Sequence, residues 1–375
     1  MKVVVLGCGF GGVEVARTLR KHTKDLDLIL VDRSTRFEYQ PAYPELLSGK
    51  VTPEEISSDL NRFAAKNSAR FVHAEVVDID FQAKLVKTRD MIQGEENDIA
   101  YDFLVIALGA EQTFFGIPGA EEFSHTVHTL QATLATRDAV VALEHAQKPT
   151  IMVIGAGLSG VEVAGELVDY FKARRLALDA RICLVEMMPR MLPACPYDKV
   201  ADCVEEFLCA RGVEALTETA VQEVSAHKIT FKSGQKLPYD LIIWTAGIKP
   251  NSLLERLNLP KVKGWLKLDQ YLRVEGMEEV FAVGDTAYFE RDGVCSGQNV
   301  EEAEYQGKTA AKNILRTLNN QELSAYKPKN TRANPRALIS MGADKAVAFS
   351  GRRMFKPFAY HIKKFVEWRY MRRFR

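Results

Sequence analysis

Two glycine-rich turns of the form G-x-G-x-x-G end apolar runs of this sequence, one at its beginning and one near its middle. In such a turn the first glycine permits a tight bend out of a strand, and the second lets the backbone approach a pyrophosphate. The third glycine lets the next helix pack closely, and the free N–H groups at the start of that helix attract an anion. The first turn contains Gly7, Gly9 and Gly12, and the second contains Gly155, Gly157 and Gly160. The sequence therefore predicts two dinucleotide-binding sites.

Each turn is followed by an acidic residue at the expected end of the next strand. Asp32 lies 20 residues beyond Gly12, and Glu186 lies 26 residues beyond Gly160. A carboxylate at this position can accept hydrogen bonds from the hydroxyl groups of a ribose. Glu186 would also repel a 2′-phosphate, and no arginine follows it directly, although Arg190 could bend back. This pattern favours NADH over NADPH at the second turn.

The elements that must position these turns repeat along the chain. The first turn lies between an expected strand at 2–6 and an expected helix at 13–21, and a further strand is expected at 28–31. The second turn has the same surroundings, and each half continues with a short apolar strand that follows a Tyr-Asp pair. We therefore predict an α/β fold with two Rossmann-like dinucleotide-binding domains, the second inserted in the first, and boundaries near residues 112 and 245.

Composition narrows the class of protein. The formal net charge of +1 gives no reason to expect nucleic acid as a partner, and the sequence contains no apolar run of the length that spans a bilayer. The first strand is expected to begin at Lys2, which leaves no room for a signal peptide and favours the cytoplasm. The six cysteines form no C-x-x-C pair and have no zinc-ligand spacing, so we predict no metal site.

Five stretches of the chain carry a resemblance to the two-dinucleotide-binding flavoprotein superfamily: "GCGFGG", "YDFLVIALGA", "VIGAGLSGVEVAGEL", "LPYDLIIWTAGIKPN" and "VFAVGDTAYF". The resemblance implies that the first domain binds FAD and the inserted domain binds NADH. It also implies that Asp285 holds the ribitol of FAD and that Gly109 lies at the crossover of the FAD domain. The predicted domains are then 1–112 with 245–325 for FAD, 113–244 for NAD(H), and 326–375 as a membrane-associating or dimerisation segment.

Within that superfamily the sequence is most similar to the type II NADH:quinone oxidoreductases and to the related sulfide:quinone oxidoreductases. The loop "FEYQPAYPELLSG" resembles the aromatic-Pro-Leu loop of the former group. The implied activity is electron transfer from NADH via FAD to a membrane quinone without proton pumping. The disulfide reductases of the superfamily are disfavoured, because the loop after Asp32 contains no cysteine.

The resemblance also indicates residues for the reaction itself, and we predict catalytic roles for Glu162, Glu301 and Gln306. Glu162 is expected on the first turn of a helix, either as a carboxylate at the helix dipole or as a group that reaches toward nicotinamide and flavin. The type II enzymes carry A-Q-x-A-x-Q-x-G beside the quinone, where this chain reads "VEEAEYQG". Glu301 replaces a glutamine there, either to bind and protonate a quinone carbonyl or as a solvated helix carboxylate.

The predicted cofactor-binding residues combine the two turns with residues beside them. They are Gly7, Gly9, Phe10, Gly12, Asp32, Arg33, Gly109, Asp285, Gly155, Gly157, Gly160, Glu186 and Gly247. Two alternatives to the NADH:quinone activity stay open. One is a sulfide:quinone oxidoreductase that uses Cys295, for which the sequence offers no second cysteine at the domain joins. The other is a non-respiratory NADH-binding flavoprotein that signals through a protein partner.

The C-terminal stretch "FKPFAYHIKKFVEWRYMRRFR" predicts an amphipathic helix with Pro357 in its first turn. From Arg352 onward the chain has nine Lys or Arg residues and a single acidic one, Glu367. Helical spacing places Phe358, Ile362, Phe365 and Val366 on one face and Lys363, Lys364, Arg372 and Arg375 off it. An apolar stripe with a basic flank fits the surface of an anionic membrane, and we expect peripheral contact on the cytoplasmic side. The alternative is a helix docked on its own protein or in a homodimer.

Overall fold

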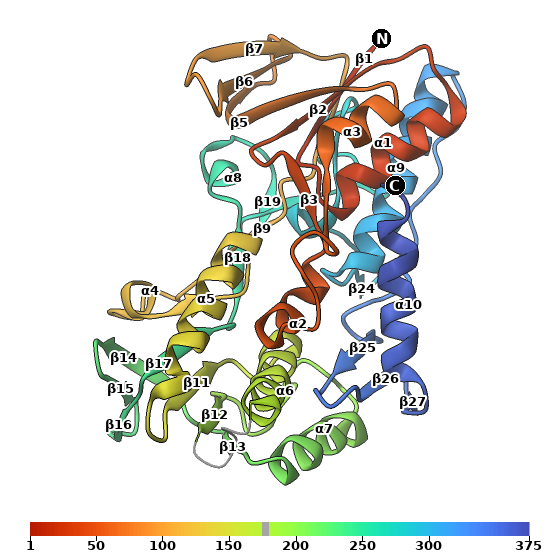
Figure 1. Cartoon of the computed structure of the whole chain (residues 1–375). Coiled ribbons are helices and arrows are strands. Elements are labelled where there is room, and N and C mark those ends of the chain that lie inside the picture. The colour runs from red at the N-terminus through yellow and green to blue at the C-terminus, as the bar shows by residue number, and fades with distance from the viewer. Residues whose placement is uncertain (175–179, 375) are drawn as a thin grey trace.

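The computed structural model describes residues 1–174 and 180–374, and its arrangement follows from two sheets built on the two glycine-rich turns. Figure 1 shows these sheets at opposite ends of the molecule. The helices are α1 (Phe10–His22), α2 (Tyr43–Ser48), α3 (Leu60–Lys66), α4 (Ala120–Phe123), α5 (Leu130–Ala142), α6 (Leu158–Ala173), α7 (Asp198–Ala210), α8 (Ser252–Arg256), α9 (Val300–Leu318) and α10 (Ala359–Met371).

The first sheet has seven strands in the order β21-β8-β1-β2-β5-β6-β7, and its members from β21 to β5 run parallel. Their bounds are β21 (Val280–Ala282), β8 (Phe103–Ile106), β1 (Lys2–Leu6), β2 (Asp27–Asp32), β5 (Arg70–Asp80), β6 (Leu85–Asp90) and β7 (Glu96–Ala100). Residues 3–6 of β1 are completely buried, as expected for a central parallel strand covered on both faces. Helices α1 and α9 pack against each other beside this sheet.

The second sheet has five parallel strands in the order β10-β17-β11-β12-β13. Their bounds are β10 (His125–Thr126), β17 (Leu241–Trp244), β11 (Thr150–Ile154), β12 (Arg181–Val185) and β13 (Val213–Leu216). All five strands lie in the sequence between β8 and β21, which are neighbours in the first sheet. The second Rossmann-like unit is therefore inserted in the first, and the predicted fold class is confirmed.

The chain crosses between the two units twice, and the two crossings pair with each other. Strand β9 (Ala110–Gln112) runs antiparallel to β18 (Ile248–Pro250). The side-chain amide of Gln112 donates to the backbone oxygens of Ala246 and Gly247, at 2.9 and 2.8 Å. The domain limits of 112 and 245 stay a prediction.

Smaller sheets complete the two units. They are β3 (Arg36–Glu38) with β4 (Ser57–Asp59); β14 (Val221–Ser225), β15 (Lys228–Phe231) and β16 (Lys236–Pro238); β19 (Lys261–Val262), β20 (Trp265–Lys267) and β22 (Ala287–Tyr288); and β23 (Glu290–Arg291) with β24 (Val294–Cys295).

The C-terminal part is more ordered than the sequence suggested. The chain that follows α9 leads into an antiparallel sheet of β25 (Arg336–Ser340), β26 (Ala346–Ser350) and β27 (Arg353–Phe355). This sheet was not predicted. Helix α10 begins only at Ala359, so the placement of Pro357 in its first turn was wrong. Arg375 lies outside the described residues.

Helix α10 connects the two units along one side of the molecule, at the right-hand edge of Figure 1. Its last turn docks on the first unit, where the rings of Tyr370 and Phe374 lie 5.5 and 4.4 Å from that of Phe37. Arg373 pairs there with Glu14 at 3.2 Å and with Glu304 at 2.8 Å. The docking of α10 on its own protein, one of the two sequence-based alternatives, is therefore part of this fold.

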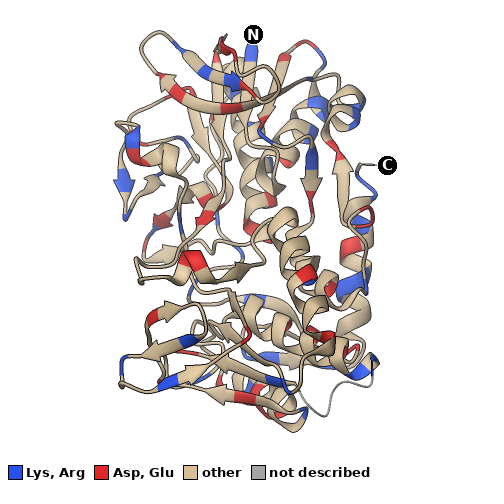
Figure 2. Ribbon diagram, turned by 60° about the vertical axis from the view of Figure 1, so that its left-hand side comes forward, with Lys and Arg blue, Asp and Glu red and all other residues tan. Residues whose placement is uncertain are grey.

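Charged residues are distributed over the whole molecule. Figure 2 shows Lys and Arg interspersed with Asp and Glu over both units. Among the described helices, none is both long and apolar enough to span a bilayer.

Candidate functional site

The two glycine-rich turns have the same backbone geometry. Gly7 and Gly155, the first glycine of each turn, have φ angles of +91° and +97°, which favour glycine over other residues. A Cβ atom on Gly7 would also lie only 2.3 Å from the backbone oxygen of Ala107. The strand-to-helix bend therefore requires glycine at this position.

The second and third glycines have equally matched surroundings. No atom would lie within 4 Å of a Cβ on Gly9 or Gly157, so both turns leave open space at the start of the helix. Gly9 and Gly157 are also the N-cap residues of α1 and α6, and neither helix has a side-chain cap. A Cβ on Gly12 or Gly160 would approach the backbone oxygen of the first glycine to 2.0 or 1.8 Å. Each turn thus presents uncapped N–H groups to open space, as a phosphate site needs.

The acidic residues at the strand ends hold the turns in the same way. Asp32 accepts hydrogen bonds from the backbone N–H of Cys8 at 2.6 Å and of Ser34 at 2.8 Å. Glu186 accepts from the N–H of Ala156 and of Met188, both at 2.9 Å. Burial raises the pKa of Asp32, and the two N–H groups oppose that rise. Each carboxylate keeps further lone pairs for a ribose hydroxyl.

Side chains beside the turns take positions that the sequence left open. Arg190 donates to Asp198 and to the backbone oxygen of Cys195, so its guanidinium is bound away from Glu186. Arg33 has an exposed side chain next to Asp32. Phe10 is buried in an aromatic cluster, where its ring lies 5.3 Å from Phe37 and 5.0 Å from Tyr370.

Asp285 lies at the end of β21 and has a carboxylate without a protein partner among the described residues. Burial raises its pKa to about 6. Gly109 is close to it, because the N–H of Gly109 donates to the hydroxyl of Thr286 at 2.8 Å. By solvent accessibility Asp285 is partly buried. A partly buried carboxylate without a donor is destabilised, and hydroxyl donors from a bound ligand would relieve that cost.

Gln306 is buried and both ends of its amide are occupied. Its oxygen accepts from the N–H of Gly284 at 2.7 Å, and its nitrogen donates to the hydroxyl of Ser296 at 3.1 Å. This geometry holds the backbone just before Asp285, and the buried amide uses one N–H and one lone pair for it. Gln306 is therefore a positioning residue in this structure, and its predicted catalytic role stays a prediction.

Glu301 lies on the first turn of α9 with 48% of its side chain exposed. The guanidinium of Arg336 donates to both of its carboxylate oxygens, and the Nε lies 2.6 Å from Oε2. The side-chain amide of Asn330 also donates to Oε2, at 3.2 Å. The next residue, Glu302, is fully buried and accepts hydrogen bonds from the backbone N–H groups of Lys329 and Asn330. The two glutamates thus fasten the chain after residue 326 to the start of α9.

Glu162 lies on the second turn of α6, not on the first, because the helix begins at Leu158. Its Oε1 accepts from the Nζ of Lys363 on α10 at 2.6 Å and from the N–H of Ser340 at 2.8 Å. Burial raises the pKa of Glu162, although the Lys363 ammonium lowers it. Two units and the C-terminal helix meet at this carboxylate.

A second glutamate, Glu45 on α2, completes a buried ion network. Lys363 lies 3.8 Å from its Oε1, and Lys364 donates to its Oε2 at 2.6 Å. Lys364 also pairs with Glu367 at 2.8 Å. The lysines expected on a membrane-facing flank therefore face inward: Lys363 is only 7% exposed.

Glu45 was missed from the sequence, although it lies in the quoted loop "FEYQPAYPELLSG". A glutamate flanked by Pro and two Leu residues is an unusual choice for a buried position, and that is the signal that could have found it. Its partners lie more than 300 positions away, and no local pattern indicates them.

Gly247 lies at the second crossing, with φ of +75°. A Cβ there would collide with the ring of Phe115, which is 63% exposed. All six cysteines are free, and burial raises the pKa of the Cys295 thiol. Within the described residues no group of His, Cys, Asp or Glu side chains is arranged to hold a metal ion.

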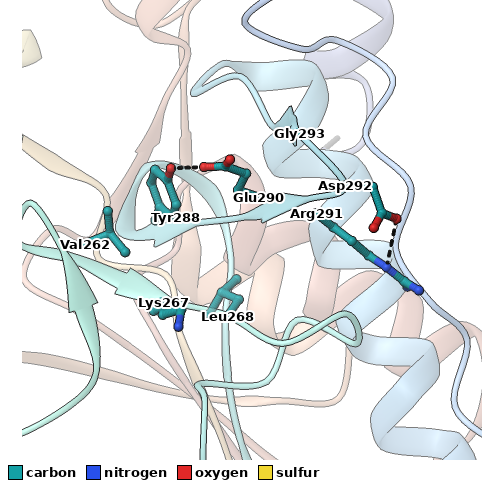
Figure 3. A pocket seen from close by; sticks show the side chains of 8 residues that line it. All are labelled: Val262, Lys267, Leu268, Tyr288, Glu290, Arg291, Asp292 and Gly293. Carbon is teal, nitrogen blue, oxygen red and sulfur yellow. Dashed lines mark hydrogen bonds and ion pairs between the residues drawn. The ribbon is translucent and has the colours of Figure 1, made fainter.

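A cavity of about 400 Å³ lies over β20, β22 and β23, outside the predicted site (Figure 3). Its charged side chains already have partners. Tyr288 donates to Glu290, Arg291 pairs with Asp292, and Lys267 pairs with Glu275 outside the cavity at 2.9 Å. These contacts leave no strong attraction for a charged ligand.

Comparisons with known proteins agree with this geometry. A model of the family described as pyridine nucleotide-disulphide oxidoreductase matches residues 1–307. The chain is 32% identical over 297 residues to a protein from Synechocystis sp. named demethylphylloquinone reductase NdbB, covering 76% of this chain and 72% of that protein. It is 28% identical over 398 residues to a type II NADH:quinone oxidoreductase from Staphylococcus epidermidis, covering 98% and 94%.

Among solved structures, the sulfide:quinone oxidoreductase from the hyperthermophilic bacterium Aquifex aeolicus has the same fold. The TM-score is 0.86, the identity 21%, and the match covers 100% of this chain and 91% of that one. This likeness concerns the fold alone.

Asp285 should give the ligand-free protein a specific pH dependence. Because the pKa of Asp285 is raised in the folded state, the folded protein binds this proton more tightly than the unfolded chain does. The resulting contribution to folding stability is fully present below pH 3.8, the ordinary pKa of Asp, and is lost as the pH rises to about 6. Asp285→Asn should therefore be more stable than the wild type above that range and gain little below it. Thermal unfolding across this range measures the difference. Asp292→Asn, at an exposed carboxyl, is the control, and an Asp285→Asn profile parallel to the wild type would contradict the prediction.

Lys363→Met should destabilise the protein by about 3–5 kcal/mol, because Glu162 would stay buried without its cation. The double variant Glu162→Gln/Lys363→Met should recover part of this loss. Urea unfolding of the single and double variants measures the coupling. Arg336→Gln, which breaks an exposed pair on α9, should cost about 1 kcal/mol or less. Equal effects of Lys363→Met and Arg336→Gln would refute the buried network.

Proposed function

The chain belongs to the pyridine nucleotide-disulphide oxidoreductase family, and we propose that it is a flavoenzyme that transfers electrons from NADH via FAD to a quinone, without proton pumping. The observation that carries this proposal is the pair of equivalent turns, each braced by its own acidic residue. Bound FAD would accept a hydride from NADH and pass two electrons to the quinone.

The residues of the first unit fit FAD. Gly7, Gly9 and Gly12 form the turn for its pyrophosphate, and Asp32 faces its ribose. Asp285 has a partly buried carboxylate without donors among the described residues, and the hydroxyl groups of a ribitol would supply them. Gln306 supports this site through Gly284. We propose that Phe10, Arg33 and Gly109 line the same site.

The second unit fits NADH rather than NADPH. Glu186 would accept hydrogen bonds from the ribose 2′-hydroxyl and repel a phosphate in its place. Arg190 lies near Glu186 in the sequence and could attract such a phosphate, but it is paired with Asp198. Glu162 follows the second turn, and we propose that it lies at the nicotinamide end of the site, with Gly247 at the crossing. The Nζ of Lys363 then lies 2.6 Å from the Glu162 carboxylate at this end of the site.

For the quinone, we propose a site at the start of α9, next to Asp285 and its neighbours. Glu301 is the candidate to bind a quinone carbonyl there, and to do so it must exchange one of its hydrogen bonds with Arg336. Such an exchange is feasible because the pair is partly exposed, so water can replace the bond that Arg336 gives up.

We propose that the outer face of α10 contacts the cytoplasmic surface of a membrane, from which a lipid-soluble quinone enters. Phe358 is 74% exposed, Phe365 56% and Trp368 47%, and all three lie on this helix or at its N-cap. Exposed aromatic side chains of this kind mark interaction surfaces. The other occupant of this face would be a second copy of the chain in a homodimer.

Neither alternative activity is favoured by an observation. Cys295 lies in β24, its sulfur is 3.6 Å from the backbone oxygen of Ser296, and its raised pKa disfavours the reactive thiolate. The solved sulfide:quinone oxidoreductase resembles this chain in fold only. A signalling flavoprotein would show slow reoxidation of its reduced flavin by every quinone.

The activity is tested by anaerobic titration of the purified yellow protein. NADH should bleach the flavin absorbance, and a short-chain quinone should restore it. Bleaching by sulfide but not by NADH would overturn the proposal, and its loss in Cys295→Ala would then assign the alternative.

Glu186→Gln should raise the KM for NADH and reduce the preference for NADH over NADPH by about tenfold or more, because a charge-assisted hydrogen bond and a phosphate repulsion are lost together. Steady-state rates with both nucleotides measure the preference. The control Glu206→Gln, at an exposed position of α7, should leave the preference for NADH over NADPH unchanged. If Glu186→Gln also leaves this preference unchanged, Glu186 does not contact the ribose.

A further inference from the structure

A second cavity, of about 480 Å³, opens where the N-terminal end of α10 meets the turn between β25 and β26. Lys345 from that turn and Lys356 from the chain before α10 line it. Phe358, Tyr360 and His361 line it as well. None of these residues belongs to the proposed cofactor or quinone sites, so the cavity calls for its own explanation.

The cations of this cavity are available to a ligand. Both lysines are exposed, and neither forms an ion pair with any residue between 1 and 174 or between 180 and 374. This contrasts with the cavity of Figure 3, where the charged side chains are paired. The nearby cations Arg352 and Arg353 are also exposed and have no ion pair in the described chain.

One acidic residue, Asp344, also lines the cavity. Its Oδ1 lies 3.5 Å from the Nζ of Lys50, and its carboxylate accepts a hydrogen bond from the hydroxyl of Tyr360. Burial is the main cause that raises the pKa of Tyr360, and the negative charge of Asp344 raises it further. Lys50 is held more closely by Asp169 at 2.6 Å and by Glu166 at 3.1 Å, so Asp344 keeps its negative charge. The cavity therefore combines two ammonium groups without an ion pair and one carboxylate, and positive charge is in excess. Its net preference is for an anion.

Exposed apolar side chains lie on the segments that precede and follow the cavity residues 356–361. Met354 and Phe355 on β27 are 36% and 48% exposed, and Phe358 at the start of α10 is 74% exposed. Ile362 and Phe365 continue the same exposed stripe along the helix. An anion that binds here must therefore be joined to apolar groups, or these side chains would remain against water.

We propose that this cavity binds the phosphate group of an anionic phospholipid, with Lys345 and Lys356 as its ligands and with Phe355 and Phe358 inserted beside the acyl chains. Exposed basic and aromatic side chains next to each other in the chain are the composition of an interfacial segment. The proposal rests on the membrane contact proposed for α10 and adds a specific site and lipid class to it. The inward-facing Lys363 and Lys364 take no part.

The test measures partition of the full chain onto phosphatidylcholine vesicles with and without phosphatidylglycerol, by co-sedimentation. Each cation held at an anionic surface strengthens binding about fivefold, so Lys345→Gln/Lys356→Gln should bind the anionic vesicles about 30-fold more weakly. Binding to pure phosphatidylcholine should not change. Phe355→Ser/Phe358→Ser should weaken binding to both kinds of vesicle.

The matched control is Lys232→Gln/Lys236→Gln on the β15–β16 hairpin, at the other side of the lower unit in Figure 1. It removes the same charge and should keep the preference for anionic vesicles. If both pairs of variants lose that preference equally, net charge explains it and the site is refuted. Saturable binding of inorganic phosphate to the wild type, together with unchanged binding of Lys345→Gln/Lys356→Gln to anionic vesicles, would assign the cavity to free phosphate and refute the lipid.

Two further measurements keep this proposal separate from others. A wild-type dimer that becomes monomeric in Phe355→Ser/Phe358→Ser would assign the surface to a second copy and overturn the proposal. Flavin reduction by NADH in solution should be the same in all these variants. Failure of that reaction in the wild type overturns the proposed activity, whereas the partition measurement does not depend on it.

Discussion

The fold depends on two buried carboxylates that no residue of their own unit neutralises. Glu45 of α2 and Glu162 of α6 come from different units, and both are paired with lysines of α10. An uncompensated charge at either position would be costly, so the lysines of α10 stabilise the packing of both units against this helix. The β9–β18 ribbon joins the units covalently, and this ion network fixes how they face each other.

This constraint explains why the C-terminal helix has two different faces. Its inner face carries Lys363, Glu367 and Tyr370, which are buried against the two units. Its outer face carries Phe358, Ile362 and Phe365, which are exposed. A helix with lysines on the inside and phenylalanines on the outside reverses the ordinary pattern, and it is stable because each buried lysine has carboxylate partners.

The two glycine-rich turns show how one backbone design serves two ligands. Their glycines, helix starts and acidic braces are nearly equivalent, which gives each turn the same ability to hold phosphates. The difference lies in what surrounds them. The first turn shares its unit with Asp285, whose partly buried carboxylate has no donor among the described residues. The second turn is followed by Glu162, whose carboxylate is already bound by Lys363.

The sequence by itself determined the two turns, the parallel sheets around them, the insertion of one unit in the other and the family. These depend on local rules: a glycine where φ is positive, an apolar run in a buried strand, an acid at a strand end. It also determined which residues of α10 form an apolar stripe. Only the tertiary structure decided that Lys363 and Lys364 face inward, that Gln306 supports the backbone before Asp285, and that Glu301 is held by Arg336. Each of these pairings joins side chains that are distant in sequence or oriented by packing. The local spacing of residue types in the sequence therefore does not indicate which groups pair.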